Sequence, residues 1–194
     1  MRLSGFVDAD RLAQRTGVEV ATVSEILERA GNDGLVVERT GRISGWILTP
    51  EGRAAHARLL ADELAEHGCR PQVEVANEAF LALNEPFKEI CTAWQLRPGG
   101  SPNDHGDLAY DAGIVADLVA LHPQAVAVTT GLATLLPRFA RYEHDFTAAL
   151  DRLRTGDPRA LAAPLSGSYH DHWMELHQDL LSTLGRERST ADGH

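Results

Sequence analysis

Histidines cluster near the end of the chain, where SYHDHWMELHQDLLSTLG places three of them within eight residues. Imidazole nitrogens bind metals and carry protons. At 100° per residue, His170 and His177 share a helical face with Trp173, whereas His172 falls on the opposite face and is expected in solvent. With a helical rise of about 1.5 Å per residue, the Cα atoms of His170 and His177 lie about 10 Å apart. The pair therefore needs outside ligands before it can hold a metal ion.

A second group of metal- and ligand-competent side chains belongs to the loop RPGGSPNDHGD, residues 97–107. Asp104 and His105 could supply the outside ligands, which makes a metal site one alternative. With Trp94 and Arg97, the same loop could instead line a small effector pocket between helices. The structural alternative is a solvated loop, with core histidines that hydrogen bond to helix ends or tyrosines. The candidate ligand-binding residues are Trp94, Arg97, Asp104, His105, His170 and His177.

Hydroxyl and guanidinium groups in the first third of the chain have the types and spacing of a DNA contact. Thr22 and Ser24 lie near the start of a predicted helix, where small polar side chains reach base edges in the major groove. Arg29 follows on the same helix and could reach a phosphate. Arg39 and Arg42 stand at the tip of a predicted hairpin, from which guanidinium groups can enter the minor groove. These five residues are the candidate DNA-binding set.

The charge of the chain limits where nucleic acid could bind. The formal net charge is -10, and residues 1–70 hold 9 Arg against 11 acids, whereas the rest holds 9 basic and 17 acidic residues. Any DNA contact is therefore expected in the first third. Glu19, Glu25 and Glu28 lie on or near the presented helix and would repel phosphates, although a carboxylate can accept from cytosine N4. The alternative use of this region is protein contact or dimerisation.

The sequence offers no motif of a known catalytic class. No Gly-rich phosphate loop follows a strand, and no Ser or Cys has the context of a nucleophile elbow. Cys69 and Cys91 have no zinc-site spacing, and so few cysteines fit a reduced compartment. No apolar run approaches the length of a membrane span. We expect a cytoplasmic protein that is not an enzyme, needs no cofactor and has no membrane partner.

The elements that would position the DNA-binding residues follow a helix–turn–helix and hairpin order. One helix is expected from Asp8 or Asp10 to Gly17, and another from about residue 19 to 31. The β-rich runs LVVER and ISGWILT predict a hairpin, and TPEG then opens a helix that extends to about His67. RLSGFV predicts a third strand beside the hairpin. Because no helix precedes this pair, another element must close the bundle.

From residue 71 onward, the apolar spacing predicts helices only. Pro86 predicts a kink or a restart after Asn84. Asp107 and Gly185 have the types of a helix N-cap and a helix stop. The expected helices cover residues 71–94, 108–121, 123–135, 137–154 and 168–184.

The segment ATVSEILERAGNDGLVVERTGRISGWILTPEGRAAH resembles the MarR-like winged-helix transcriptional regulators, above all in its GLV…R…LTPEGR passage. The resemblance covers about the first 67 residues. The remainder, with CTAWQLRPGG, PNDH and the histidine segment, resembles an uncharacterised actinobacterial group usually labelled as transcriptional regulators. The resemblance implies a dimer that binds a pseudo-palindromic operator and releases it on binding a small molecule. It places Thr22 and Ser24 in the recognition helix, and Arg39 and Arg42 in the wing.

Together these features predict a mainly α protein with two domains. Residues 1–67 are expected to form a winged helix-turn-helix domain with a small antiparallel β-wing and a linker helix. Residues 68–194 are expected to form an all-helical domain for ligand sensing or assembly. The expected function is transcriptional regulation, with double-stranded DNA, a small-molecule effector and a second copy of the chain as partners. The alternatives are a protein-interaction module without DNA binding, and a helical protein that binds a metal or ligand through its His/Asp cluster.

Overall fold

The computed structural model describes residues 5–41 and 44–187 of the 194-residue chain. It is mainly helical (72%), with a two-stranded antiparallel sheet, which confirms the expected mainly α class with a small hairpin. The chain divides into two compact units, Met1–Glu63 and Leu64–His194. The boundary falls inside a single helix, Pro50–His67.

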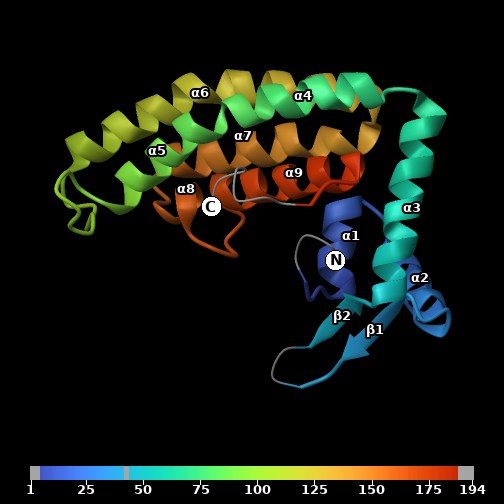
Figure 1. Cartoon of the computed structure of the whole chain (residues 1–194). Coiled ribbons are helices and arrows are strands. Elements are labelled where there is room, and N and C mark those ends of the chain that lie inside the picture. The colour runs from blue at the N-terminus through green and yellow to red at the C-terminus, as the bar shows by residue number, and fades with distance from the viewer. Residues whose placement is uncertain (1–4, 42–43, 188–194) are drawn as a thin grey trace. The chain divides into compact units, whose positions relative to one another are not determined.

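The first unit contains two short helices, a hairpin and the start of a longer helix (Figure 1). Its elements are α1 (Ala9–Thr16), α2 (Val20–Asn32), β1 (Val36–Arg39), β2 (Gly45–Leu48) and α3 (Pro50–His67). The Asp8 carboxylate caps α1 by accepting from the backbone N–H of Arg11 at 2.7 Å. Gly17 ends the helix with a left-handed φ of 69°, so α2 begins after a turn of three residues, 17–19.

Strands β1 and β2 pair from Val36 opposite Leu48 to Arg39 opposite Gly45. Val7 forms an isolated antiparallel bridge with Trp46, through backbone hydrogen bonds of 2.8 and 3.2 Å. The bridge lies at the end of the predicted strand 2–7, whose first residues are outside the described range. A third segment of the chain therefore pairs with β2, through Val7 alone.

The core of the first unit is small. Ala13, Val23 and Leu27 are its buried members, and partly buried Trp46 packs against them. The indole lies so close to Gly31 that a Cβ there would stand 3.3 Å from a ring carbon. Within this unit, the hairpin covers α1 and α2 through Trp46.

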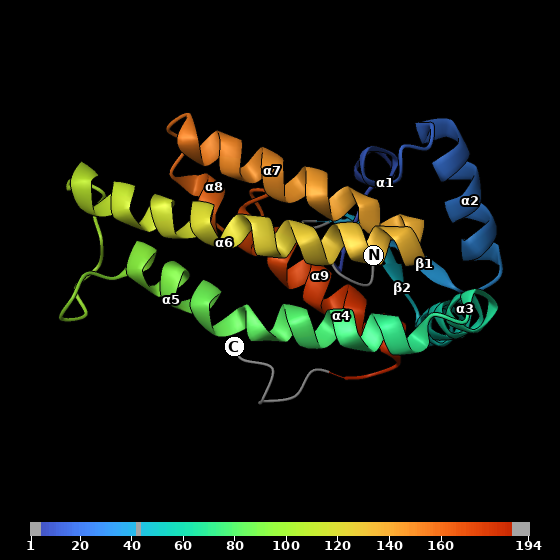
Figure 2. The same cartoon turned by 90° about the horizontal axis from the view of Figure 1, so that it is seen from above.

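The second unit is a bundle of long helices (Figures 1 and 2). Helix α6 packs against α4, α5 and α7, and α9 packs against α4, α7 and α8. Figure 2 shows α4 and α5 following one line beside α6. The elements are α4 (Arg70–Ala82), α5 (Asn84–Gln95), α6 (Leu108–Leu135), the 3₁₀ turn η1 (Pro137–Phe139), α7 (Ala140–Arg154), α8 (Arg159–Ala162) and α9 (Tyr169–Leu184).

Prolines act differently in two of these helices. Leu83 separates α4 from α5, so the predicted restart near Asn84 is confirmed; Pro86 is the third residue of α5, where its missing N–H costs no helical hydrogen bond. The predicted division into helices 108–121 and 123–135 is wrong, because α6 continues through residue 122 and Pro123. An interior proline costs about 3 kcal/mol. Burial of Leu121 before Pro123 and of Ala125 after it helps to offset that cost.

Helix α6 also corrects the expectation about apolar length. As one helix of 28 residues with a mean hydropathy of 1.4 in its most apolar window, it is long and apolar enough to cross a membrane by length and composition. A core helix of a bundle meets the same test. Ile114, Leu118 and Leu132 of α6 are buried in the core of the second unit.

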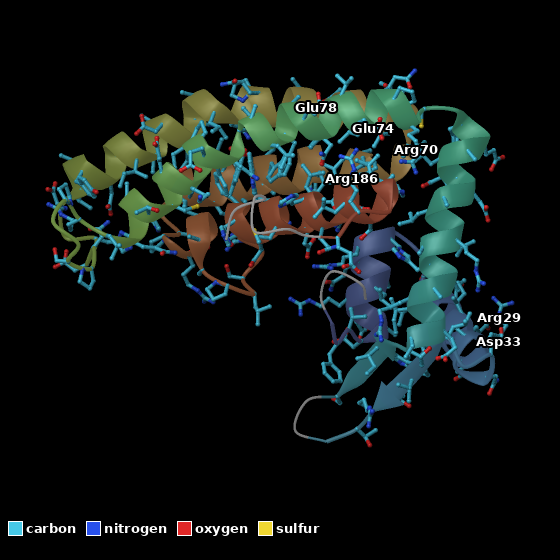
Figure 3. The ribbon with its side chains drawn as sticks, in the orientation of Figure 1. Arg29, Asp33, Arg70, Glu74, Glu78 and Arg186 are labelled. Carbon is cyan, nitrogen blue, oxygen red and sulfur yellow. The ribbon has the colours of Figure 1, made fainter. Side chains whose placement is uncertain are left out.

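The final helix has the ends that the sequence predicts. Ser168 and Asp171 form a reciprocal capping box at its start, and Gly185 ends it with a φ of 67°. Beyond the end, Arg186 lies 3.4 Å from Glu74, and Arg70 lies 3.6 Å from the same carboxylate (Figure 3). Arg70 also donates to the last carbonyl of α9, so these contacts tie the end of α9 to the start of α4.

Candidate nucleic-acid surface and ligand cavity

The candidate recognition helix is α2, and its three predicted DNA-binding residues differ in accessibility. Thr22 is exposed, whereas Ser24 is half-buried and its hydroxyl donates to the carbonyl of Val20 at 3.0 Å. Arg29 is exposed near the end of α2, one turn before Asp33 (Figure 3). Thr22 is thus the more accessible of the two hydroxyls.

The hairpin carries the remaining predicted cations. Arg39 is the last residue of β1 and is exposed. Arg42 lies outside the described residues. Gly45, opposite Arg39, has a φ of 139°, and a Cβ there would come within 3.0 Å of the Val7 carbonyl oxygen. Because of this close approach, only glycine fits at position 45, the residue of β2 that pairs with Arg39.

The surface of α2 combines acids with apolar side chains. Glu25 and Glu28 are exposed on the helix. Val20 and Ile26 are 41% and 45% exposed, and Val18, just before the helix, is 38% exposed. An acidic and apolar surface is better suited to protein than to phosphate.

A cavity of about 260 Å³ lies in the second unit, between one face of α5 and one face of α9. It contains His170 and His177 of the predicted ligand-binding set. The spacing along each helix is three or four residues, so each contributes a single face. The lining residues are Asn84, Phe87, Lys88, Cys91, Thr92, Gln95, His170, Trp173, Met174 and His177.

The restart after Leu83 explains why a cavity forms here. Helix α4 packs against α9, whereas α5 packs against α6 and α8. The first residue of α5, Asn84, stays close to α9 and accepts a hydrogen bond of 2.7 Å from Trp173 Nε1. Further along α5, the side chains Cys91, Thr92 and Gln95 face the cavity.

Aromatic rings form the floor of the cavity. The rings of Phe87 and Trp173 stack with centroids 4.2 Å apart and planes 24° apart. The His170 ring stacks on Phe87, with centroids 6.1 Å apart and planes 21° apart. Phe87, Trp173 and His177 are each only 2% exposed. The cavity therefore has a rigid aromatic wall with nearly parallel rings.

Burial favours the uncharged forms of two cavity residues, Cys91 and His170. Burial raises the pKa of the Cys91 thiol to about 12. Burial lowers the pKa of His170, and nearby Asp171 opposes this shift. The Nζ atom of Lys88 lies 3.1 Å from the Glu85 carboxylate, which balances its charge.

Of the other predicted ligand-binding residues, Trp94 lies near the end of α5, and Arg97, Asp104 and His105 lie in the loop between α5 and α6. Their hydrogen bonds go to neighbouring residues of the loop and of α6. Asn103 Nδ2 donates to the Trp94 carbonyl at 3.1 Å and to Asp111 at 2.8 Å. His105 Nδ1 lies 2.9 Å from the other Asp111 oxygen, and its ring lies 4.5 Å from the Trp94 ring. His105 adopts a left-handed φ of 59°. The network holds the loop against the end of α5.

The side chains of Arg97 and Asp104 also stabilise the conformation of this loop. Arg97 pairs with Asp107 at 3.0 Å, and its guanidinium lies 4.2 Å from the centre of the Tyr110 ring. Asp107 caps α6 through the Tyr110 N–H; that hydrogen bond, and then the one from Arg97, lower the pKa of its carboxyl. Asp104 accepts from the Gly106 N–H at 3.0 Å.

The structure separates the four residues of the metal alternative. His105 belongs to the loop network, whereas His170 and His177 line the cavity. Within residues 5–41 and 44–187, no group of three or more His, Cys, Asp or Glu side chains is arranged to hold a metal ion. The geometry does not support the metal alternative.

A polar network that links α9 to η1 and α7 had no counterpart in the sequence-based prediction. Asp179 accepts from Arg138 at 2.5 Å and from the Tyr142 hydroxyl at 2.9 Å, while Glu175 accepts from Arg141 at 3.0 Å. Burial raises the pKa of Tyr142 well above its usual value, so its hydroxyl keeps the proton that it donates. Helical spacing indicated the apolar face of α7 but not the partner of each charge across the bundle.

The chain was compared with known proteins in three ways. A scan against protein-family models, a search of curated proteins and a search of solved structures each found no match.

Proposed function

We propose that the first unit is a winged helix that binds double-stranded DNA and that the chain is a transcriptional regulator. One arrangement carries the proposal: α1 and α2 are joined by a short turn at Gly17, and a hairpin with an exposed arginine follows at once. In proteins of this design, the second helix enters the major groove and the hairpin contacts the neighbouring backbone or minor groove.

Each contact in the proposal has a role. Thr22 faces base edges, Ser24 lies beside it on the partly buried side of α2, and Arg29 reaches a phosphate. Arg39 and Arg42 of the hairpin hold the minor groove or the backbone. A second copy of the chain supplies the matching half-site contact, and the helical unit senses a small molecule or mediates this assembly.

A second candidate function is protein interaction through the same unit. The observation that favours it is the surface of α2, where Glu25 and Glu28 lie beside the exposed side chains of Val20 and Ile26. Such a surface would dock on a partner with apolar and basic side chains.

Binding to labelled genomic DNA fragments over a series of salt concentrations separates the two functions. A DNA-binding protein binds more tightly as salt falls, because each neutralised phosphate releases counterions. The Arg39→Ala/Arg42→Ala variant should weaken binding and flatten the salt dependence. Arg58, an exposed arginine of α3, provides the matched control in Arg58→Ala. Absence of binding by the wild-type protein at low salt would contradict the regulator and leave the protein-interaction function.

A further inference from the structure

We propose that the cavity between α5 and α9 binds an uncharged, planar aromatic molecule of one or two fused rings that carries hydrogen-bonding nitrogen or oxygen atoms. The cavity lies wholly within the second unit. An effector role for this ligand would rest on the proposed regulatory function. Binding of the ligand is measured in the absence of DNA. A failure of the cavity proposal can therefore be distinguished from a failure of the proposed regulatory function.

The planar shape follows from the rings. His170, Phe87 and Trp173 form a stack whose neighbouring planes differ by 21° and 24°. Phe80 supports the far side of the indole, with ring centroids 4.6 Å apart. Phe87 and Trp173 are each 2% exposed, so a planar guest extends this stack at the half-buried His170 ring, where offset stacking of aromatic rings is favoured. A bulky saturated guest has no flat face with which to match it.

The charges of the lining residues indicate that the guest carries no net charge. None of the ten lining residues is a carboxylate, and the one ammonium group, on Lys88, is paired with Glu85. Cys91 keeps its proton because burial disfavours the thiolate. A charged guest would lose its hydration and find no unpaired counter-charge in compensation.

Hydrogen-bonding groups surround the aromatic floor on several sides. Thr92 and Gln95 are exposed at the rim on α5, and His170 is half-buried on the α9 side. A hydroxyl, a primary amide and an imidazole can each donate or accept. A heteroaromatic ring with a lactam or ring nitrogen satisfies such groups, whereas a plain hydrocarbon leaves them without a ligand partner.

The volume limits the size of the guest. The cavity measures about 260 Å³. Sites for drug-sized ligands usually span about 300–1,000 Å³. A space below this range suits a guest of one or two fused rings.

Isothermal titration calorimetry of the full chain with three neutral probes tests the proposal. The probes are isoquinolin-1-one, quinazolin-4-one and benzimidazole at a pH where it is uncharged. At least one should bind with one-to-one stoichiometry and a Kd below about 1 mM. The anion 1-naphthoate and the non-planar 1-adamantanol should each bind at least about tenfold more weakly, a difference of about 1.4 kcal/mol. No binding by any of the three probes, or tighter binding of either comparison compound, overturns the proposal.

Two matched variants locate the binding. Thr92→Trp places a large side chain at the rim without changing the core, and should lower probe affinity at least about tenfold. Thr147→Trp makes the same change at an exposed position of α7 and should leave the affinity within about twofold. Circular dichroism verifies that both variants fold. Equal affinities of Thr92→Trp and the wild-type protein would place the probe elsewhere and overturn the assignment.

Discussion

Gly52, in the first turn of α3, lies against the carbonyl oxygen of Leu35, so closely that a Cβ atom at Gly52 would overlap that oxygen. Thr49 completes the junction: its hydroxyl accepts from the Gly52 N–H at 3.0 Å and donates to the Gly34 carbonyl at 2.7 Å. Arg53 donates to the Leu48 carbonyl at 3.0 Å. The LTPEGR passage, which carries much of the family resemblance, thus joins the hairpin to α3 through internal contacts.

Gly52→Ala should destabilise the first unit. The added methyl group forces the hairpin away from α3, and overpacking of this kind costs about 1–3 kcal/mol or more. Gly113→Ala in α6 is the matched control, since a Cβ there meets no atom within 4 Å. That change should stabilise the protein by about 0.5–1 kcal/mol, the usual gain for a helical glycine. Urea unfolding followed by circular dichroism measures the free energy of unfolding of both variants. If Gly52→Ala and Gly113→Ala change it equally, the contact with Leu35 relaxes without cost.

The elements whose signals are local could be predicted from the sequence. Asp8 and Gly17 mark the ends of α1, and Ser168 and Gly185 mark those of α9, because capping groups act within one turn. The break predicted at residue 122, just before Pro123, was wrong for the opposite reason. Whether a helix continues through a proline depends on burial of its neighbours by other helices, which is not a local signal.

The candidate cavity could be predicted only in part. Helical spacing placed His170 and His177 on an inward face, and both line the cavity. It could not show which face of another helix lies opposite, so Cys91 and Thr92 of α5 were missed. Residues of the loop after α5, such as His105, have ligand-competent types, yet their hydrogen bonds close the loop itself.

Asp179→Ala should destabilise the bundle, because Asp179 accepts hydrogen bonds from Arg138 and Tyr142. Loss of an acceptor bonded to a charged donor costs about 1.5–3 kcal/mol. Asp151→Ala provides a control, since Asp151 pairs with Arg154 at 3.8 Å on the exposed side of α7. Exposed pairs contribute about 0–1 kcal/mol. Chemical denaturation measures the difference, and equal losses in the two variants would refute a stabilising role for the network.

Cys91 should react slowly with thiol reagents in the native protein. Its pKa of about 12 leaves a thiolate fraction at pH 8 that is about 1,000-fold lower than that of an exposed thiol. Alkylation with iodoacetamide, followed by mass spectrometry of the peptide that contains Cys91, gives the rate. The same reaction in denaturant is the control and should be fast. Rapid modification of the native protein would show that burial does not suppress this thiolate.

Stability should fall as the pH is lowered from 7.5 to 5.5, partly because of His170. Burial lowers the pKa of His170 in the folded chain, so the unfolded chain binds more protons as the pH falls below about 6.5. One such site contributes at most about 1.4 kcal/mol per pH unit.

Urea unfolding at the two pH values should therefore show a smaller loss of stability for His170→Gln than for the wild-type protein. His144→Gln changes an exposed histidine of α7 and serves as the control. This variant should lose as much stability between the two pH values as the wild-type protein. If His170→Gln also loses as much stability as the wild-type protein, burial of a neutral His170 is not the source of the pH dependence.

Neutralising the acids of α2 should strengthen DNA binding if this helix enters the major groove. Glu25 and Glu28 are exposed on α2, where their carboxylates would face phosphates across the groove. The Glu25→Gln/Glu28→Gln variant removes this repulsion without changing side-chain size, and we expect non-specific affinity to rise about 3- to 10-fold at low salt. Glu89→Gln, at an exposed position of α5, is the control for net charge. Fluorescence anisotropy with a labelled duplex measures all three proteins. A gain confined to the α2 variant supports a helix that faces DNA, whereas equal affinities would mean that its acidic surface faces something other than phosphate.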